Sequence, residues 1–262
     1  MCIRDRGLAA LPEYLVSNSN NVIKVLPKSE GPITEAHFVY PQSLKNTARV
    51  TAFRNFLFRK IIFRNLGLMD FHETVLKMQS FNQKRNSITP DEIWFLEHYP
   101  VYSYGVSTDL SNLPNGLSHP LVKTDRGGKI TYHAPGQILV YILMDYNRAD
   151  IKPKMFIKKF QSAIFKSITE FCKEAELNES ESGIFYDAFK LASFGLKMTK
   201  KGSYHGASIN HKMELNDWDQ IVICGNPENE AKDLYSMDIL VSKESLTGSI
   251  STNINNNFYS MI

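Results

Sequence analysis

Cysteine is scarce in this chain of 262 residues, which contains Cys2, Cys172 and Cys224 and no other cysteine. Three dispersed cysteines do not make the disulfide framework of a secreted scaffold, and the lack of a CxxC pair excludes the commonest zinc motifs. We therefore expect a reducing compartment, namely the cytoplasm. Pro12 and Glu13 interrupt the apolar stretch near the start of the sequence, which argues against a secretory signal peptide.

Long apolar runs and a dominant charge are absent as well. The longest apolar run, residues 138–144, has seven residues, far fewer than the roughly 20 that cross a bilayer as a helix. The 30 basic and 27 acidic residues leave a formal net charge of +3, which does not by itself indicate nucleic acid as a partner. Hydrophobic residues at 43% and charged residues at 22% exclude disordered, collagen-like and coiled-coil chains and indicate a globular protein.

The beginning of the chain lacks regular patterning. Residues 1–55 contain polar, turn-prone stretches and no sustained helical or strand period, so we treat them as an N-terminal extension of unknown role and residues 56–262 as the main domain. Residues 36–69 contain no Asp or Glu. This composition is typical of a targeting or membrane-surface segment, or of a basic edge leading into a first strand, and we favour the basic edge.

Two segments carry helix patterns. Asp70 followed by Glu73 forms a capping box, which predicts a helix over 71–84. Residues 152–177 predict an amphipathic helix lying on a sheet. Its apolar face consists of Phe156, Phe160, Ile164, Ile168 and Phe171. Cys172 lies beside this face, and we interpret it as a small core residue rather than a nucleophile.

Strand patterns occur on both sides of the second helix. Branched and aromatic runs bounded by turn residues predict strands over 93–97, 137–145, 183–186, 189–199, 203–209 and 220–224. Lys200, Lys201 and Gly202 form the expected hairpin turn between two of them. Since no regular alternation of strand and helix is present, the pattern favours an α+β fold over a doubly wound one.

The most unusual string spans residues 124–137. Its glycines let the backbone approach a ligand closely, while Arg126, Lys129, Tyr132 and His133 offer hydrogen-bond donors around the gap. A tight inter-strand loop is the alternative interpretation. A second Tyr-His pair occurs in Tyr204-His205-Gly206, and either histidine could be a hydrogen-bonded core residue.

Cys224 and Lys190 are the two residues best suited to nucleophilic chemistry. Cys224 ends a short apolar run just before Gly225, where a strand would open into a loop. A thiol becomes a nucleophile when a neighbouring charge stabilises its thiolate. Lys190 stands alone in an apolar stretch, and the pattern leaves open whether it faces solvent from an edge strand or meets such a thiolate.

Taken together, these strings resemble the octanoyltransferases of lipoic acid synthesis, also called lipoyl(octanoyl) transferases. The resemblance covers residues 62–240 in four ordered blocks. These are Arg126-Gly127-Gly128 with Thr131-Tyr132-His133 and Pro135-Gly136-Gln137, then Lys190-Leu191-Ala192-Ser193-Phe194-Gly195, then Tyr204-His205-Gly206 with Asn210, and finally Cys224-Gly225. The chain departs from the pattern at Ala134, where glycine is usual, and at Ile223, where proline is usual. Residues 1–55 have no counterpart.

The resemblance implies an α+β fold with a mixed sheet and flanking helices, similar to the catalytic domain of biotin and lipoate protein ligases. It implies that residues 56–262 form an octanoyltransferase catalytic domain acting in lipoate biosynthesis and protein lipoylation. The expected substrates are octanoyl-acyl carrier protein and a lysine of lipoyl domains, in 2-oxoacid dehydrogenase complexes and the glycine cleavage H protein. No cofactor, metal or nucleic acid is implied.

The resemblance also implies roles for residues. Cys224 would form the acyl-thioester, while Lys190 would place a positive charge beside the thiolate and shuttle protons. The expected substrate-binding residues are Arg126, Gly127, Gly128, Lys129, Ile130, Thr131, Tyr132, His133, Ser193, Phe194, Gly195, Gly206, Ala207 and Ser208. Backbone amides near Gly195 or Gly206 would hold the oxyanion, and the sequence leaves the choice open. The alternatives are an ATP-dependent lipoate or biotin ligase and a non-catalytic binding protein.

Overall fold

The computed structural model describes residues 61–259 except 110, 112 and 149, together with the backbone of two short strands near the start. The chain divides into two units, residues 1–60 with 87–90, and residues 61–86 with 91–262. In the first unit, β1 (Cys2–Ile3) and β2 (Leu8–Ala9) pair antiparallel. The predicted extension over 1–55 otherwise lies outside the described residues, as does most of the basic segment, so both stay predictions.

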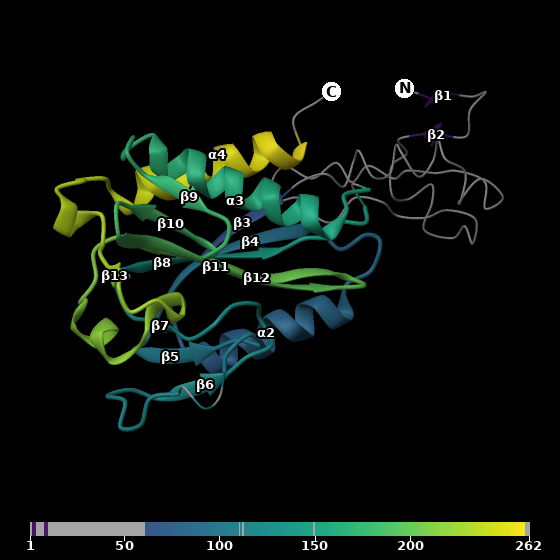
Figure 1. The fold of residues 1–262 in the computed structure, drawn as a ribbon. Coiled ribbons are helices and arrows are strands. Elements are labelled where there is room, and N and C mark those ends of the chain that lie inside the picture. Colours follow the sequence, from purple (N-terminus) through teal and green to yellow (C-terminus); the bar gives the residue numbers. More distant parts are fainter. Residues whose placement is uncertain are drawn as a thin grey trace. The chain divides into compact units, whose positions relative to one another are not determined.

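The second unit is built on an eight-stranded mixed sheet (Figure 1). Its strand order is β3 (Ile61–Met69), β4 (Asp91–His98), β8 (Gln137–Leu143), β12 (Gly202–Asn210), β11 (Phe189–Thr199), β10 (Gly183–Tyr186) and β9 (Glu176–Asn178). β13 (Glu230–Ala231) pairs in parallel with β11, β3 pairs in parallel with β4, and the other pairs are antiparallel. The predicted α+β fold with a mixed sheet is confirmed.

Three helices cover the two faces of this sheet. Figure 1 shows α3 (Pro153–Thr169) and α4 (Lys243–Tyr259) over one face and α2 (Phe71–Lys84) on the other. A second sheet, with the order β6 (Leu121–Lys123), β5 (Val101–Tyr104) and β7 (Thr131–His133), lies on the same side as α2. Short 3-10 turns follow β12, namely η4 (Asn216–Gln220), η5 (Ile223–Gly225) and η6 (Tyr235–Met237).

Both predicted helices are present, but the predicted end of the second at residue 177 is wrong, because α3 ends at Thr169 and residues 176–178 form β9. α2 has the predicted bounds, and the Asp70 side chain accepts a hydrogen bond from the Glu73 amide at 2.8 Å, which is one arm of the capping box. α3 buries most of its predicted apolar stripe, and Cys172 is buried in the same core. The placement of Phe171 in that stripe is wrong. α3 ends at Thr169, so Phe171 leaves the helical period and is 38% exposed.

The apolar run in β8 is explained by burial on both faces of the sheet. Ile138, Val140 and Ile142 pack into the core under α3 and α4. Leu139 and Tyr141, which alternate with them, belong to the core around α2. A strand covered on both sides needs apolar residues at successive positions, and its residues of opposite parity reach opposite cores.

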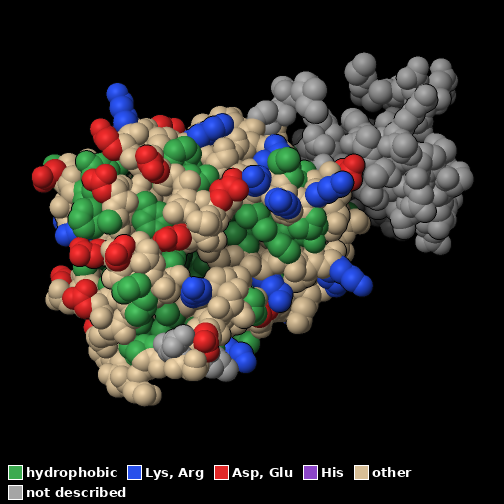
Figure 2. Space-filling view, in the orientation of Figure 1, with side chains coloured by type: hydrophobic (Ala, Val, Ile, Leu, Met, Phe, Trp, Pro, Cys, Tyr) green, Lys and Arg blue, Asp and Glu red, His purple; other side chains and the backbone are tan. Residues whose placement is uncertain are grey.

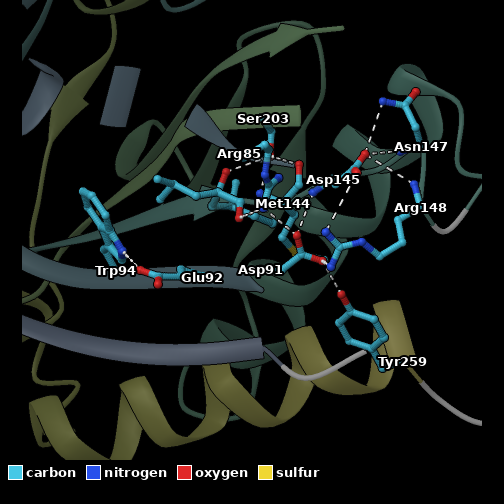
Figure 3. A network of polar contacts seen from close by, with 12 residues as sticks. Arg85, Asp91, Glu92, Trp94, Met144, Asp145, Asn147, Arg148, Ser203 and Tyr259 are labelled. Carbon is cyan, nitrogen blue, oxygen red and sulfur yellow. Dashed lines mark hydrogen bonds and ion pairs between the residues drawn. The ribbon is translucent and has the colours of Figure 1, made fainter. Parts of the chain in front are cut away.

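A buried carboxylate ties four elements together (Figure 3). Asp91 Oδ1 accepts hydrogen bonds from Arg85 Nη2, at the end of α2, and from the Asp145 amide, after β8, both at 2.8 Å. Asp91 Oδ2 accepts one from the Tyr259 hydroxyl of α4 at 2.7 Å. A buried charge is costly unless its hydrogen-bond partners are in place. This network therefore stabilises the observed arrangement of β4 with the C-terminal ends of α2, β8 and α4.

The predicted strand over 220–224 is wrong. Its β-branched residues give it a strand composition, but Ile221 and Ile223 are instead buried in an aromatic core with Tyr102, Tyr132 and Trp218. The chain turns through η5 there, and Cys224 has a φ of 56°. Packing against the second sheet therefore overrides the local strand propensity.

The surface carries side chains of both charges (Figure 2), as the nearly balanced numbers of basic and acidic residues lead us to expect. Figure 2 shows both basic and acidic side chains on the face it presents, with acidic ones more frequent toward the β13 side. Among the helices of the described part, none is long and apolar enough to span a membrane.

Candidate functional site

A cavity of about 280 Å³ lies on the face of the large sheet opposite α3 and α4. Its walls come from β8, β11, β12, the loop before β7 and the turn η5. The predicted site residues that line it are Arg126, Gly128, Lys129, Ile130, Thr131, His133, Lys190, Ser193, Phe194, Gly195, Gly206, Ala207, Ser208 and Cys224. The fold thus brings together four segments that are far apart in the sequence.

Two predicted binding residues lie outside the cavity wall. The Tyr132 ring packs against Tyr102, with 4.9 Å between ring centroids, and its hydroxyl donates to Asp217 at 3.0 Å. Gly127 donates its amide to the Leu196 carbonyl at 2.9 Å, which ties the loop to β11. Both residues therefore support the cavity wall without lining the cavity.

Lys190 and Cys224 meet at one end of the cavity. Lys190 Nζ lies 2.5 Å from Cys224 Sγ. Lys190 is only 3% exposed, so the interpretation as a solvent-facing edge lysine is wrong. Its ammonium also lies 5.1 Å from the centroid of the Phe185 ring. A cation in this position stabilises a thiolate more strongly than it would in water, because little solvent screens the pair.

A β-bulge aims Lys190 at the cavity. β10 and β11 pair Ile184 with Ala192 and then Phe185 with Lys190, so Leu191 is skipped in the ladder. Leu191 packs into the core under α3 and α4, whereas Lys190 faces the cavity. Side chains alternate between the two faces of a sheet along a strand. One extra residue therefore moves each following side chain to the face opposite the one it would otherwise occupy. Without the bulge, Lys190 would point into the apolar core.

The turn that carries Cys224 has an unusual backbone. Cys224 has a φ of 56°, in the left-handed region that costs a non-glycine residue about 1 kcal/mol. Lys129 Nζ donates to the Cys224 carbonyl at 2.9 Å and so holds the turn from the opposite wall. Strained residues persist where the surroundings over-determine them, as at active sites.

A backbone carbonyl contacts both members of the pair. The Glu181 carbonyl oxygen accepts a hydrogen bond from Lys190 Nζ at 3.1 Å and lies 3.2 Å from Cys224 Sγ. Ser182, the next residue, has a φ of 47°. The sulfur, this carbonyl and the Phe185 ring together surround the Lys190 side-chain nitrogen.

Arg126 places a second cation in the wall. Its Nη2 donates to the Ser103 carbonyl at 2.8 Å and to the Ser103 hydroxyl at 3.0 Å, and Nη1 donates to the Gly127 carbonyl at 3.0 Å. Its Nε has no hydrogen-bond partner among the described residues. Burial lowers the pKa of Arg126 to about 10, so the guanidinium stays charged at neutral pH.

A chain of hydrogen bonds connects His133 with the backbone of Lys190. His133 Nδ1 donates to Gln137 Oε1 at 2.7 Å, and Gln137 Nε2 donates to Asn210 Oδ1 at 2.9 Å. Asn210 Nδ2 in turn donates to the Lys190 carbonyl at 3.3 Å. We assign the His133 proton to Nδ1, because the Gln137 amide nitrogen has acceptors of its own. Burial lowers the pKa of His133 well below its usual value, so the ring is neutral.

Two further histidines are buried beside the cavity. Burial lowers the pKa of His98 to about 4; its Nε2 lies 2.8 Å from the Tyr141 hydroxyl. Burial likewise lowers the pKa of His205, which lies 3.3 Å from Asp125 Oδ1. The pKa of Asp125 falls to about 2, chiefly because of its hydrogen bond with His205. Both rings are neutral at pH 7.

The two candidate oxyanion glycines are direct partners across β11 and β12. Gly195 pairs with Gly206, which also pairs with Tyr141 of β8. A Cβ atom on Gly206 would lie 2.0 Å from the Val140 carbonyl oxygen, so only glycine allows β8 and β12 to approach so closely there. Which amide serves an oxyanion stays a prediction.

The cavity wall contains residues that the sequence did not single out as binding residues. They are Phe71, Ser107, Leu139, Tyr141, Ser180, Glu181, Ser182, His205, Trp218 and Ile223. For Leu139 and Tyr141 the signal was present, because residues of one parity in a strand share a face. For residues 180–182 no local signal exists. Within the described residues, no group of three or more His, Cys, Asp or Glu side chains is placed to hold a metal ion.

Comparisons with known proteins agree with this geometry. The family model for the lipoyl protein ligase A/B catalytic domain matches residues 71–248. The chain is 41% identical over 162 residues to an octanoyltransferase from Laribacter hongkongensis, covering 62% of this chain and 78% of that protein. It is 35% identical over 190 residues to an octanoyltransferase from Nitrosomonas eutropha, covering 72% and 84%.

A solved structure shares the fold. A bipartite lipoate protein ligase from Thermoplasma acidophilum matches with a TM-score of 0.59 at 12% sequence identity, covering 76% of this chain and 84% of that one. At this identity the match establishes the architecture alone. The sequence relatives establish more, and the chain belongs to the lipoyl protein ligase A/B catalytic-domain family and, within it, to the octanoyltransferases, which are acyltransferases of lipoate synthesis.

Proposed function

We propose that this protein moves an octanoyl group from octanoyl-acyl carrier protein to a lysine of a lipoyl domain through a thioester on Cys224. The observation that carries the proposal is the contact between Lys190 Nζ and Cys224 Sγ, 2.5 Å apart in the cavity wall. A paired thiolate is a competent nucleophile toward a thioester. The reducing cytoplasm would keep this thiol free.

In the first half-reaction, the Cys224 thiolate attacks the carbonyl carbon of the octanoyl thioester. A new bond forms between Sγ and this carbon, and the bond to the carrier's sulfur breaks. The departing thiolate takes a proton from the Lys190 ammonium, so that the carrier leaves as a thiol and Lys190 becomes a neutral amine. Exchange of one thioester for another is nearly balanced in energy.

In the second half-reaction, the neutral amine of the acceptor lysine attacks the same carbon. An amide bond forms, the Sγ–carbon bond breaks, and Cys224 returns to its thiolate. The proton that the amine loses passes to Lys190, which restores the ammonium. One residue thus serves as acid and then as base, and the enzyme returns to its starting state.

The remaining walls supply binding and charge stabilisation. Apolar side chains including Phe71 and Leu139 line the cavity and suit an aliphatic chain. The Arg126 guanidinium and the neutral His133 sit among them. The fixed charge of Arg126 favours negative charge that develops on the acyl oxygen. We assign the predicted binding residues of the cavity wall to this acyl and thioester site.

The experiment that tests this function is incubation with octanoyl-acyl carrier protein, followed by intact-mass measurement. A covalent octanoyl adduct on the protein is the expected result. A parallel incubation with octanoate and ATP covers the alternative, because an ATP-dependent ligase of the same fold would activate the free acid and needs no cysteine at position 224. Acceptor modification only with octanoate and ATP would replace our proposal with that alternative. No adduct and no acceptor modification in either would indicate a non-catalytic binding protein.

A further inference from the structure

Gly183 lies directly beneath the catalytic ammonium. It belongs to β10, where it pairs with Ser193 of β11 and Asn178 of β9. A Cβ atom built on Gly183 would lie 2.6 Å from Lys190 Cε and 2.8 Å from Lys190 Nζ. Carbon atoms in contact normally stay about 3.5–4.0 Å apart. The lysine side chain therefore occupies the space that any larger residue at 183 would need.

Backbone conformation does not explain this glycine. The positive-φ glycines of the described residues do not include Gly183. An alanine at 183 would thus be free of left-handed strain, and its main conflicts would be with the Lys190 side chain and with the Ala192 carbonyl oxygen, at 2.9 Å. Of these two neighbours, the end of the lysine is the one that can move.

The same segment also holds the pair from the other side. The Glu181 carbonyl accepts a hydrogen bond from Lys190 Nζ and lies 3.2 Å from Cys224 Sγ. Ser182 has a φ of 47°, and its carbonyl accepts from the Phe194 amide of β11 at 2.8 Å. Residues 181–183, which we call the strap, are thereby fixed to β11. The Glu181 carbonyl binds the Lys190 ammonium, and the missing side chain of Gly183 leaves the space that the lysine occupies.

We propose that the strap is a positioning element for the catalytic pair and that Gly183 is a positioning residue, which keeps the Lys190 ammonium against Cys224 by leaving room for its side chain. This inference rests on the proposed function. The bulge at Leu191 turns Lys190 toward the cavity. The strap then determines the position of the Lys190 ammonium within the cavity. Gly183→Ala would push the ammonium away from the sulfur without removing any reacting group.

The test is a double-mutant cycle on the reactivity of Cys224. Parent, Gly183→Ala, Lys190→Ala and the double variant are alkylated with iodoacetamide from pH 6 to pH 10, and modification of Cys224 is followed by peptide mass. We expect Gly183→Ala to be roughly tenfold slower at pH 7, with its pH profile moved upward by about one unit, because the thiolate loses its neighbouring charge. The double variant should react no more slowly than Lys190→Ala.

Two controls separate positioning from general damage. Gly248→Ala in α4 adds a Cβ that meets nothing within 4 Å beyond its chain neighbours and the adjacent backbone of its own helix, and this variant should alkylate as the parent does. If Gly183→Ala only distorts the site through Ala192, it will slow the reaction by the same factor in the Lys190→Ala background, and the proposal is overturned. A parental rate in Gly183→Ala or in Lys190→Ala overturns it too. Formation of the octanoyl adduct in the parent is judged separately, so the proposed function stands or falls on its own.

Discussion

Lys190 and Ser193 face the same cavity although three positions separate them on β11. In a regular strand, residues three apart point to opposite faces. The bulge at Leu191 accounts for the difference. The reactive end of the site therefore depends on this bulge in β11.

The first prediction concerns the two cysteines in the main domain. Cys224→Ala removes the nucleophile and should abolish octanoyl transfer. Cys172 is 1% exposed within the core, so Cys172→Ala should keep turnover and cost on the order of 1 kcal/mol of unfolding free energy. Steady-state transfer assays and thermal melts of the two variants check this. Equal turnover of Cys224→Ala and the parent would contradict the mechanism.

The second prediction separates the two roles of Lys190. Lys190→Ala removes both the charge and the proton donor, so transfer should be lost and alkylation of Cys224 at neutral pH should slow. Lys190→Arg keeps the charge but does not readily release a proton. It should preserve much of the thiolate reactivity and still lose turnover. Alkylation and transfer rates measured side by side check this, and an arginine variant with parental turnover would exclude proton transfer by Lys190.

The third prediction is a loss of stability in mild acid. The pKa of His98 is held at about 4 in the folded protein by burial, while an unfolded histidine titrates near 6.5. Between these values the unfolded state binds the proton and the folded state does not, so stability falls as pH falls from 6.5 to 4. His98 alone contributes about 3 kcal/mol of this loss by pH 4.

His98→Gln provides the control for that slope. Urea unfolding from pH 7 to pH 4 should show a shallower decline for this variant, by up to about 1.4 kcal/mol per pH unit. His133 and His205, whose pKa values burial also lowers, keep part of the slope in the variant. Asp125 titrates near pH 2 in the folded protein and acts below this window. Identical slopes in variant and parent would show that His98 is not held neutral.

The fourth prediction concerns the start of α2. Asp70→Ala removes the acceptor for the Glu73 amide and should lower the unfolding free energy by about 1 kcal/mol. Asp70→Ser retains a capping oxygen and should restore most of it. Asp70 and Glu73 do not contact Lys190 or Cys224, so the rate of octanoyl transfer at low temperature should change little in either variant. Denaturant melts of the three proteins check the order parent, serine, alanine.

Much of the fold was predictable because local patterns and tertiary packing agree. Asp70 and Glu73 mark the start of α2, and the bounds predicted for β10 and β11 are those observed. The prediction failed at residues 220–224, where an apolar run of strand composition packs into the aromatic core as a turn. The composition of this segment indicates that its side chains are buried, but it does not determine whether the backbone forms a strand or a turn.

The sequence singled out many residues of the cavity wall but not the geometry that brings them together. Ordered motifs pointed to Lys190 and Cys224, but neither the skipped residue Leu191 nor the carbonyl of Glu181 has a sequence pattern. Both arise from pairing between strands distant in the chain. Tyr132 illustrates the converse, since a residue inside the strongest motif turns its side chain into the supporting core.

In the proposed mechanism, Cys224 carries the acyl group between the carrier protein and the lipoyl domain. The most direct measurement is a single-turnover chase, in which the protein is charged with isotopically labelled octanoyl-acyl carrier protein, separated from it, and mixed with a lipoyl domain. We expect the label to map to the peptide containing Cys224 and then to move to the acceptor lysine at a rate no slower than overall turnover. Label on any other residue, or a Cys224 adduct that the acceptor does not discharge, would contradict it.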